Sequence, residues 1–93
     1  MRLITQFIWR KHALERMLER SITRNEVMEC AYKGEVIESY PEDYPFPSFL
    51  VLYSEPIPLH IVMAMEGEDC YIITAYRPSP DEFENNFTTR IKR

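Results

Sequence analysis

The hydrophobic pattern changes its period at Gly34, and this change limits the fold to a mixture of helices and strands. Before Gly34, between His12 and Lys33, apolar residues recur with the period of a helix. After Gly34, the apolar runs are short, rich in β-branched and aromatic residues, and bounded by proline or glycine, as is typical of strands. The sequence therefore predicts an α+β fold, with a helical hairpin packed on an antiparallel sheet.

Two helices are expected, over residues 11–20 and 23–33. On a helical wheel of the first segment, the charged residues share one face. The other face carries four apolar residues: Ala13, Leu14, Met17 and Leu18. Thr23 and Glu26 have the spacing of a capping box, which predicts where the second helix begins. Gly34 stands where a glycine commonly ends a helix.

The order β-α-α-β-β-β-β is expected, with about four strands in the antiparallel sheet. A first strand is predicted within residues 3–9, and later strands within residues 35–40, 48–54, 59–66 and 70–77. The chain is expected to be a single domain over residues 1–93. Its core spans about residues 3–84, and residues 85–93 form a C-terminal tail with a frayed end.

The register of the last hairpin depends on the loop near Gly67. A three-residue loop over residues 67–69 pairs His60 with Tyr76 and gives the better division into faces. It places Tyr71 on the apolar face and Ile72 on the opposite face. His60, Thr74 and Tyr76 then share the less apolar face, where a functional site is expected.

The charges are divided unevenly along the chain. Overall there are 11 Lys and Arg against 15 Asp and Glu, a net charge of −4, which weakly opposes nucleic-acid binding. Residues 1–33 carry seven basic and four acidic groups, whereas residues 34–93 carry four basic and eleven acidic groups. This division fits either a positive face on an acidic molecule or an ordinary mixed surface.

Composition excludes several classes of protein. No apolar run approaches the length that spans a bilayer, and the N-terminus lacks the features of a signal peptide, so a cytoplasmic protein without membrane contact is expected. Cys30 and Cys70 are expected to be reduced thiols. Together with His12 and His60 they match no compact metal motif, and two glycines cannot build a phosphate-binding loop. No metal or cofactor is therefore expected.

Four groups of residues could carry chemistry. His12, Arg16 and Arg20 form one stripe of the first helix, which suits phosphate recognition, although arginines on an outer helical face are more often simply solvated. His60 lies inside a predicted strand. It could act as a general acid or base, or it could be a structural histidine whose ring is hydrogen-bonded. Tyr76 and Arg77 could orient a phosphate, or could form a cross-strand aromatic pair and a surface charge. The same ambiguity between base stacking and packing applies to five aromatic residues: Tyr40, Tyr44, Phe46, Phe49 and Tyr53.

Four ordered motifs resemble a small prokaryotic domain family of undefined function. They are H-A-x-x-R-M-x-x-R from His12, Y-P-x-D-x-P-x-P-S from Tyr40, P-L-H ending at His60, and I-I-T-A-Y ending at Tyr76. That family is grouped with the RelE-like ribonuclease toxins. The resemblance implies a toxin of a type II toxin-antitoxin system that cleaves mRNA without a metal, often on the ribosome. It also implies a cognate antitoxin, similar to small proteins with a zinc finger and a helix-turn-helix.

The resemblance also suggests roles for residues at the matching positions. His12, Arg16, His60 and Tyr76 are the candidate catalytic residues, with one histidine accepting the 2′-hydroxyl proton and the other, or Tyr76, protonating the leaving oxygen. The candidate substrate-binding residues are Arg20 and Thr74 from the matching motifs, together with two basic neighbours outside them, Lys11 and Arg77. Two alternatives are a non-catalytic protein-binding module of the same fold and, with less support, a small operon regulator.

Overall fold

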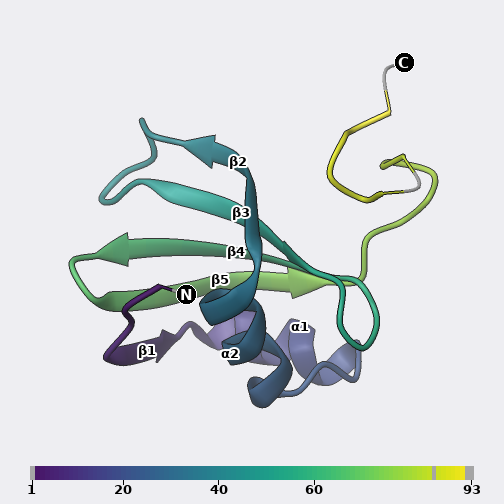
Figure 1. Ribbon diagram of the computed structural model, residues 1–93. Coiled ribbons are helices and arrows are strands. Elements are labelled where there is room, and N and C mark those ends of the chain that lie inside the picture. Colours follow the sequence, from purple (N-terminus) through teal and green to yellow (C-terminus); the bar gives the residue numbers. More distant parts are fainter. Residues whose placement is uncertain (1, 85, 92–93) are drawn as a thin grey trace.

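Two helices lie on one side of a five-stranded sheet in the computed structural model, which describes residues 2–84 and 86–91 (Figure 1). The α+β class is as expected. The elements follow in the order β1 (Gln6–Trp9), α1 (Lys11–Glu19), α2 (Arg24–Lys33), β2 (Glu35–Tyr40), β3 (Ser48–Tyr53), β4 (Leu59–Glu66) and β5 (Asp69–Tyr76).

The sheet is mixed and has five strands, where an antiparallel sheet of about four was expected. Its strand order is β1-β5-β4-β3-β2, and β1 pairs with β5 in parallel, from Gln6 opposite Asp69 to Trp9 opposite Ile72. The other neighbouring strands are antiparallel. The N-terminal strand joins the sheet because β5 would otherwise leave a row of backbone donors and acceptors unpaired at the edge.

The start of α2 follows the sequence prediction. Thr23 Oγ1 accepts a hydrogen bond from the Glu26 amide at 3.1 Å, and Glu26 Oε1 accepts one from the Thr23 amide at 3.0 Å. The capping box is thereby confirmed. In α1, Ala13 and Met17 are buried as expected, but Leu18 is 83% exposed because it lies at the rim of the apolar face.

The turn between β4 and β5 is shorter than expected. It contains two residues, Gly67 and Glu68, so that Glu66 pairs with Asp69. Gly67 has a φ of +59°, the left-handed backbone conformation that tight hairpin turns favour and that glycine adopts without strain. The prediction of a three-residue loop was therefore wrong at this end of the hairpin.

A β-bulge corrects the register further along the same hairpin. The pairing shifts between Val62 and Met63, so His60 lies opposite Tyr76 as predicted. Between the turn and the bulge, the side chains of β5 point to the opposite faces of the sheet from those predicted. Ile72 is fully buried in the core under the helices, and Tyr71 stacks on Phe46 at 5.6 Å between ring centroids. The shorter turn and the bulge offset each other, so His60 still pairs with Tyr76.

The hydrophobic core lies between the helices and one face of the sheet. It joins both helices to β3, β4 and β5, and its most buried members include Ala13, Val27, Ala31, Val51, Ile61, Ile72 and Ala75. The opposite face of the sheet carries His60 and Tyr76. The chain after β5, here called the C-terminal segment (residues 79–84 and 86–91), lies on the side of the sheet away from the helices (Figure 1).

Gly34 is required for space. Its φ of −72° is one that any residue adopts, and it does not form a left-handed helix end. A Cβ atom there would lie 2.5 Å from the Cys30 carbonyl oxygen, 2.6 Å from Val51 Cγ1 and 2.7 Å from the Leu52 carbonyl oxygen. Two of these contacts are backbone atoms, so α2 passes β3 at a distance that only glycine allows.

We expect Gly34→Ala to lower the free energy of unfolding by about 1–3 kcal/mol, the usual cost of overpacking. Gly67→Ala is the matched control, because it adds a Cβ with no atom within 4 Å but in a left-handed conformation. Its cost should be smaller, about 1 kcal/mol. Urea unfolding of both variants tests this, and an equally stable Gly34→Ala protein would contradict the close approach.

Candidate functional site

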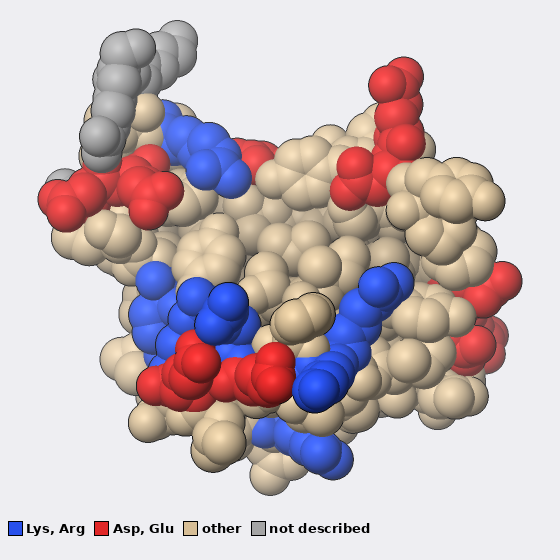
Figure 2. Space-filling view, turned by 180° about the vertical axis from the view of Figure 1, so that it is seen from behind, with Lys and Arg blue, Asp and Glu red and all other residues tan. Residues whose placement is uncertain are grey.

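Three of the predicted site residues meet in an open pocket at the end of β5. Arg20, Tyr76, Arg77 and Glu82 line this pocket, which has a volume of about 580 Å³. Arg20 follows α1 directly, Tyr76 and Arg77 lie at the end of β5, and Glu82 belongs to the C-terminal segment. Figure 2 shows the molecule from behind the view of Figure 1. Its centre is uncharged, most of the basic side chains in view lie below that centre, and acidic side chains lie around the rim. We call this pocket the β5 pocket.

The two arginines of the β5 pocket are anchored differently. Arg20 donates from Nη1 to the Ala75 carbonyl oxygen at 2.8 Å, which fixes the end of α1 to β5. Arg77 donates from Nη2 to the carboxylate of Glu26, and its Nη1 lies 3.4 Å from the carbonyl oxygens of Ile57 and Pro58. The Arg77 hydrogen bond holds the pKa of Glu26 below its ordinary value. Arg77 therefore builds the wall of the pocket.

His60 lies next to the β5 pocket and has no free ring nitrogen. Its Nδ1 is 3.2 Å from the Tyr76 hydroxyl, its Nε2 is 2.8 Å from the Phe87 carbonyl oxygen, and its exposure is 0%. The rings of Tyr76 and Phe83 meet it edge-on, with centroids 5.3 Å and 4.5 Å away. Burial lowers the pKa of His60 and raises the pKa of Tyr76. His60 thus lacks the accessible nitrogen that a general acid or base needs.

The C-terminal segment covers His60. Phe83 is buried against the histidine ring, and the chain returns through a β-bridge between Phe83 and Arg90. Arg90 then donates to the Glu38 carboxylate from Nε at 2.6 Å and from Nη2 at 3.1 Å. Its guanidinium also lies 5.0 Å from the Phe83 ring centroid. The described residues of the expected frayed tail therefore contact β2 and β4.

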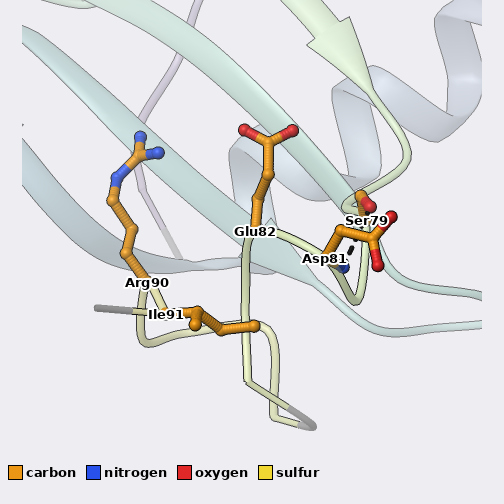
Figure 3. A pocket seen from close by; sticks show the side chains of 5 residues that line it. All are labelled: Ser79, Asp81, Glu82, Arg90 and Ile91. Atoms are coloured by element: carbon orange, nitrogen blue, oxygen red, sulfur yellow. Dashed lines mark hydrogen bonds between the residues drawn. The ribbon is translucent and has the colours of Figure 1, made fainter. Parts of the chain in front are cut away.

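A second pocket lies within the C-terminal segment and has a volume of about 450 Å³. Five side chains line it: Ser79, Asp81, Glu82, Arg90 and Ile91 (Figure 3). The Asp81 amide donates to Ser79 Oγ at 3.1 Å, which fixes the turn. Glu82 lines both pockets, so this carboxylate stands between them.

The remaining predicted site residues do not join this cluster. His12 has an 88% exposed side chain and pairs with Glu15 at 3.4 Å, while Arg16 pairs with Glu19 at 3.0 Å. Lys11 is also exposed, at the start of α1. These residues form a solvated face of the helix. The two histidines lie apart, since His12 is on an outer helix face and His60 is on the sheet face away from the helices.

Thr74 shares the sheet face of His60, opposite Val62, and is half-buried. Sequence reasoning missed four residues near the pocket: Glu82, Phe83, Phe87 and Arg90. The signal for these residues is the presence of two phenylalanines in a polar tail. Isolated large apolar residues in such a segment tend to pack on the domain. Of the five aromatics considered for base stacking, Phe49 and Tyr53 pack against the core, and Phe46 stacks on Tyr71.

The cysteines are structural. Cys30 and Cys70 are fully buried, and their Sγ atoms contact the Val51 and Leu59 carbonyl oxygens and the Met63 sulfur, respectively. Burial raises the pKa of each thiol to about 12. Among the described residues, no group of three or more His, Cys, Asp or Glu side chains is placed to hold a metal ion.

Comparison with known proteins identifies one family. A family model described as a domain of unknown function, DUF4258, matches residues 9–77. The match includes Arg20, His60, Tyr76 and Arg77 and ends before the C-terminal segment. No curated protein and no solved structure matches the chain. None of the helices in the described part of the chain is long and apolar enough to cross a membrane.

We expect His60 to make stability depend on pH. Its pKa in the folded protein lies below its ordinary value of 6.5, so the unfolded chain binds the proton first as pH falls. The free energy of unfolding should therefore be highest above pH 6.5 and should decline below it, by at most about 1.4 kcal/mol per pH unit from this group.

Urea unfolding between pH 7.5 and pH 5 tests this expectation. His60→Gln should show a shallower decline than the wild type, and His12→Gln, which changes an exposed histidine, should decline like the wild type. Identical pH profiles for the wild type and His60→Gln would contradict a neutral buried ring.

Proposed function

The chain belongs to the DUF4258 family, and we propose that it is a toxin-type endoribonuclease that cleaves mRNA without a metal ion. The observation that supports this proposal is the convergence of two guanidinium groups, a phenol and a carboxylate on one open pocket, the β5 pocket. Arginine is well suited to the phosphodiester, because its planar guanidinium forks onto phosphate oxygens. The RelE-like resemblance of the motifs agrees with this choice of substrate.

The proposed chemistry uses the pocket residues in place of the two histidines. Arg20 binds the phosphate and stabilises the negative charge that develops as the 2′-oxygen attacks phosphorus. Glu82 accepts the 2′-hydroxyl proton, because its carboxylate is exposed in the same pocket. The products are a 2′,3′-cyclic phosphate and a 5′-hydroxyl, whose oxygen takes a proton from solvent. Arg77 holds the wall of the pocket and adds positive charge.

The proposed setting is a type II toxin-antitoxin pair. A net charge of −4 is unlike a protein that binds nucleic acid over a wide surface, so RNA contact is confined to the local cluster of arginines. Ribosome-bound mRNA is a suitable substrate, since the ribosome would supply the remaining affinity. The proposed antitoxin is a small protein with a zinc finger and a helix-turn-helix.

We expect induced expression in bacteria to arrest growth and to cleave bulk mRNA. Glu82→Gln and Arg20→Gln should each reduce cleavage by about 100-fold or more, as loss of a general base or of a charge-stabilising group does. Glu84→Gln and Arg16→Gln are the matched controls, because they remove the same charges at exposed positions outside the pocket. Mapping of cellular mRNA ends measures the effect, with circular dichroism to show that each variant folds. Cleavage that persists in folded Glu82→Gln and Arg20→Gln proteins would place the chemistry elsewhere.

A second candidate function, a non-catalytic protein-binding module, is favoured by a separate observation. An apolar pocket of about 350 Å³ lies at the other end of the sheet, lined by Arg2, Leu3, Val36, Phe49, Met63, Met65 and Gly67. Leu3 is 68% exposed there, and β2, which carries Val36, is an edge strand. An exposed apolar pocket beside a sheet edge is typical of protein recognition.

We expect Leu3→Glu to weaken the complex with the antitoxin by about 10-fold or more, because it places a charge in the apolar pocket. Leu18→Glu is the matched control, since Leu18 is also an exposed leucine but lies on α1 outside the pocket. Co-purification with the protein encoded beside this chain measures the effect. If Leu3→Glu and Leu18→Glu bind equally well, the apolar pocket is not the binding surface.

A further inference from the structure

The direction of the Tyr76 hydroxyl is fixed by a chain of two hydrogen bonds that begins at a backbone carbonyl. His60 Nε2 lies 2.8 Å from the Phe87 carbonyl oxygen, and His60 Nδ1 lies 3.2 Å from the Tyr76 hydroxyl oxygen. A carbonyl oxygen can only accept a hydrogen bond, so Nε2 must carry a proton. His60 is fully buried, and its position between Phe83 and Tyr76 holds the ring in place.

The other ring nitrogen then accepts the proton of Tyr76. Burial and the nearby Arg90 guanidinium favour the neutral form of His60, against the opposing effects of Glu38 and of the Phe87 hydrogen bond. A neutral imidazole has one N–H, so Nδ1 offers only its lone pair. The Tyr76 hydroxyl has one proton, and it donates that proton to Nδ1. Its oxygen therefore offers only lone pairs to any further partner.

We infer that His60 is a positioning residue, held in its Nε2–H form by the Phe87 carbonyl, and that it makes Tyr76 a hydrogen-bond acceptor that selects a ligand hydroxyl. This inference rests on the proposed function for the identity of the ligand. Arg20 and Arg77 attract a phosphate, and Tyr76 lines the same pocket, so its oxygen favours a ligand with a hydrogen-bond donor close to that phosphate. In RNA that donor is the 2′-hydroxyl of the nucleotide that follows the phosphate. It is distinct from the attacking hydroxyl that Glu82 deprotonates, and DNA lacks it. Tyr76 and His60 thus determine a preference for ribose over deoxyribose.

The same geometry predicts the effect of acid. When His60 takes a second proton, Nδ1 becomes a donor, and the Tyr76 hydroxyl must turn its own proton toward the pocket. The charged and titratable groups that face His60 are Tyr76 on β5, Glu38 on β2 and Arg90 on the C-terminal segment. The preference for ribose should therefore be lost on the acid side of the His60 titration.

The first experiment measures the tautomer and needs no RNA. Two-bond ¹H–¹⁵N spectra of the full-length protein, labelled at its two histidines, distinguish Nε2–H from Nδ1–H, and His12→Gln assigns the signals. We expect a neutral His60 with its proton on Nε2 at pH 7. A proton on Nδ1, or on both nitrogens, would overturn the inference whether or not the protein acts on RNA.

The second experiment measures the ratio of affinities for an RNA oligonucleotide and its deoxyribose counterpart, in a Glu82→Gln background that prevents cleavage. We expect RNA to be preferred, and Tyr76→Phe and His60→Gln each to reduce the ratio by about 5- to 10-fold, the value of one hydrogen bond. His12→Gln should leave the ratio unchanged. A general loss of fold would weaken both ligands equally and would not alter the ratio.

The outcomes separate the two proposals. An unchanged ratio in Tyr76→Phe would overturn the selection of ribose by Tyr76, even if RNA binds. Failure of the Glu82→Gln protein and of the wild type to bind either oligonucleotide would overturn the proposed function and the ribose preference with it. In that case the spectra still decide whether His60 holds the Tyr76 proton.

Discussion

A buried imidazole that must find partners for both nitrogens organises the sheet face away from the helices. An unpaired polar group at such a site would cost about 1–3 kcal/mol, so the chain supplies a hydroxyl from β5 and a carbonyl from the C-terminal segment. The carbonyl brings the segment over the sheet, and Phe83 and Arg90 then pack there with Glu38. The position of Glu82, and with it the composition of the β5 pocket, follows from this arrangement.

The elements of the fold were predictable because each depends on local signals. The two helices, the capping box at Thr23 and the order of the strands follow from periodicity and from residues a few positions apart. The parallel pairing of β1 with β5 was not predictable in this way, since it joins segments about sixty residues apart. The β-bulge between Val62 and Met63, where Ile73 of β5 is the extra residue, was equally hidden. A two-residue turn and a bulge together produce the same pairing of His60 with Tyr76 as a longer loop.

The candidate site was predictable in its residue types and only partly in its arrangement. Arg20, Tyr76 and Arg77 were identified by chemistry and motif, and they do line one pocket. His12 and Arg16 share a helix stripe with Arg20, but only Arg20 reaches β5, because it lies at the end of the helix where the chain turns toward the sheet. The role of His60 depends on Phe83 and Phe87, and contacts across such sequence distances leave no periodic pattern.

Glu26 takes part in two arrangements at once. Its Oε1 caps the first turn of α2, and its Oε2 accepts the hydrogen bond from Arg77 that forms one wall of the β5 pocket. Local unfolding of that first turn would release the carboxylate from Thr23 and loosen Arg77 in the same event. Opening of this helix end and loosening of the pocket wall would therefore be coupled, and a partner that binds the beginning of α2 would also stabilise Arg77 in its place.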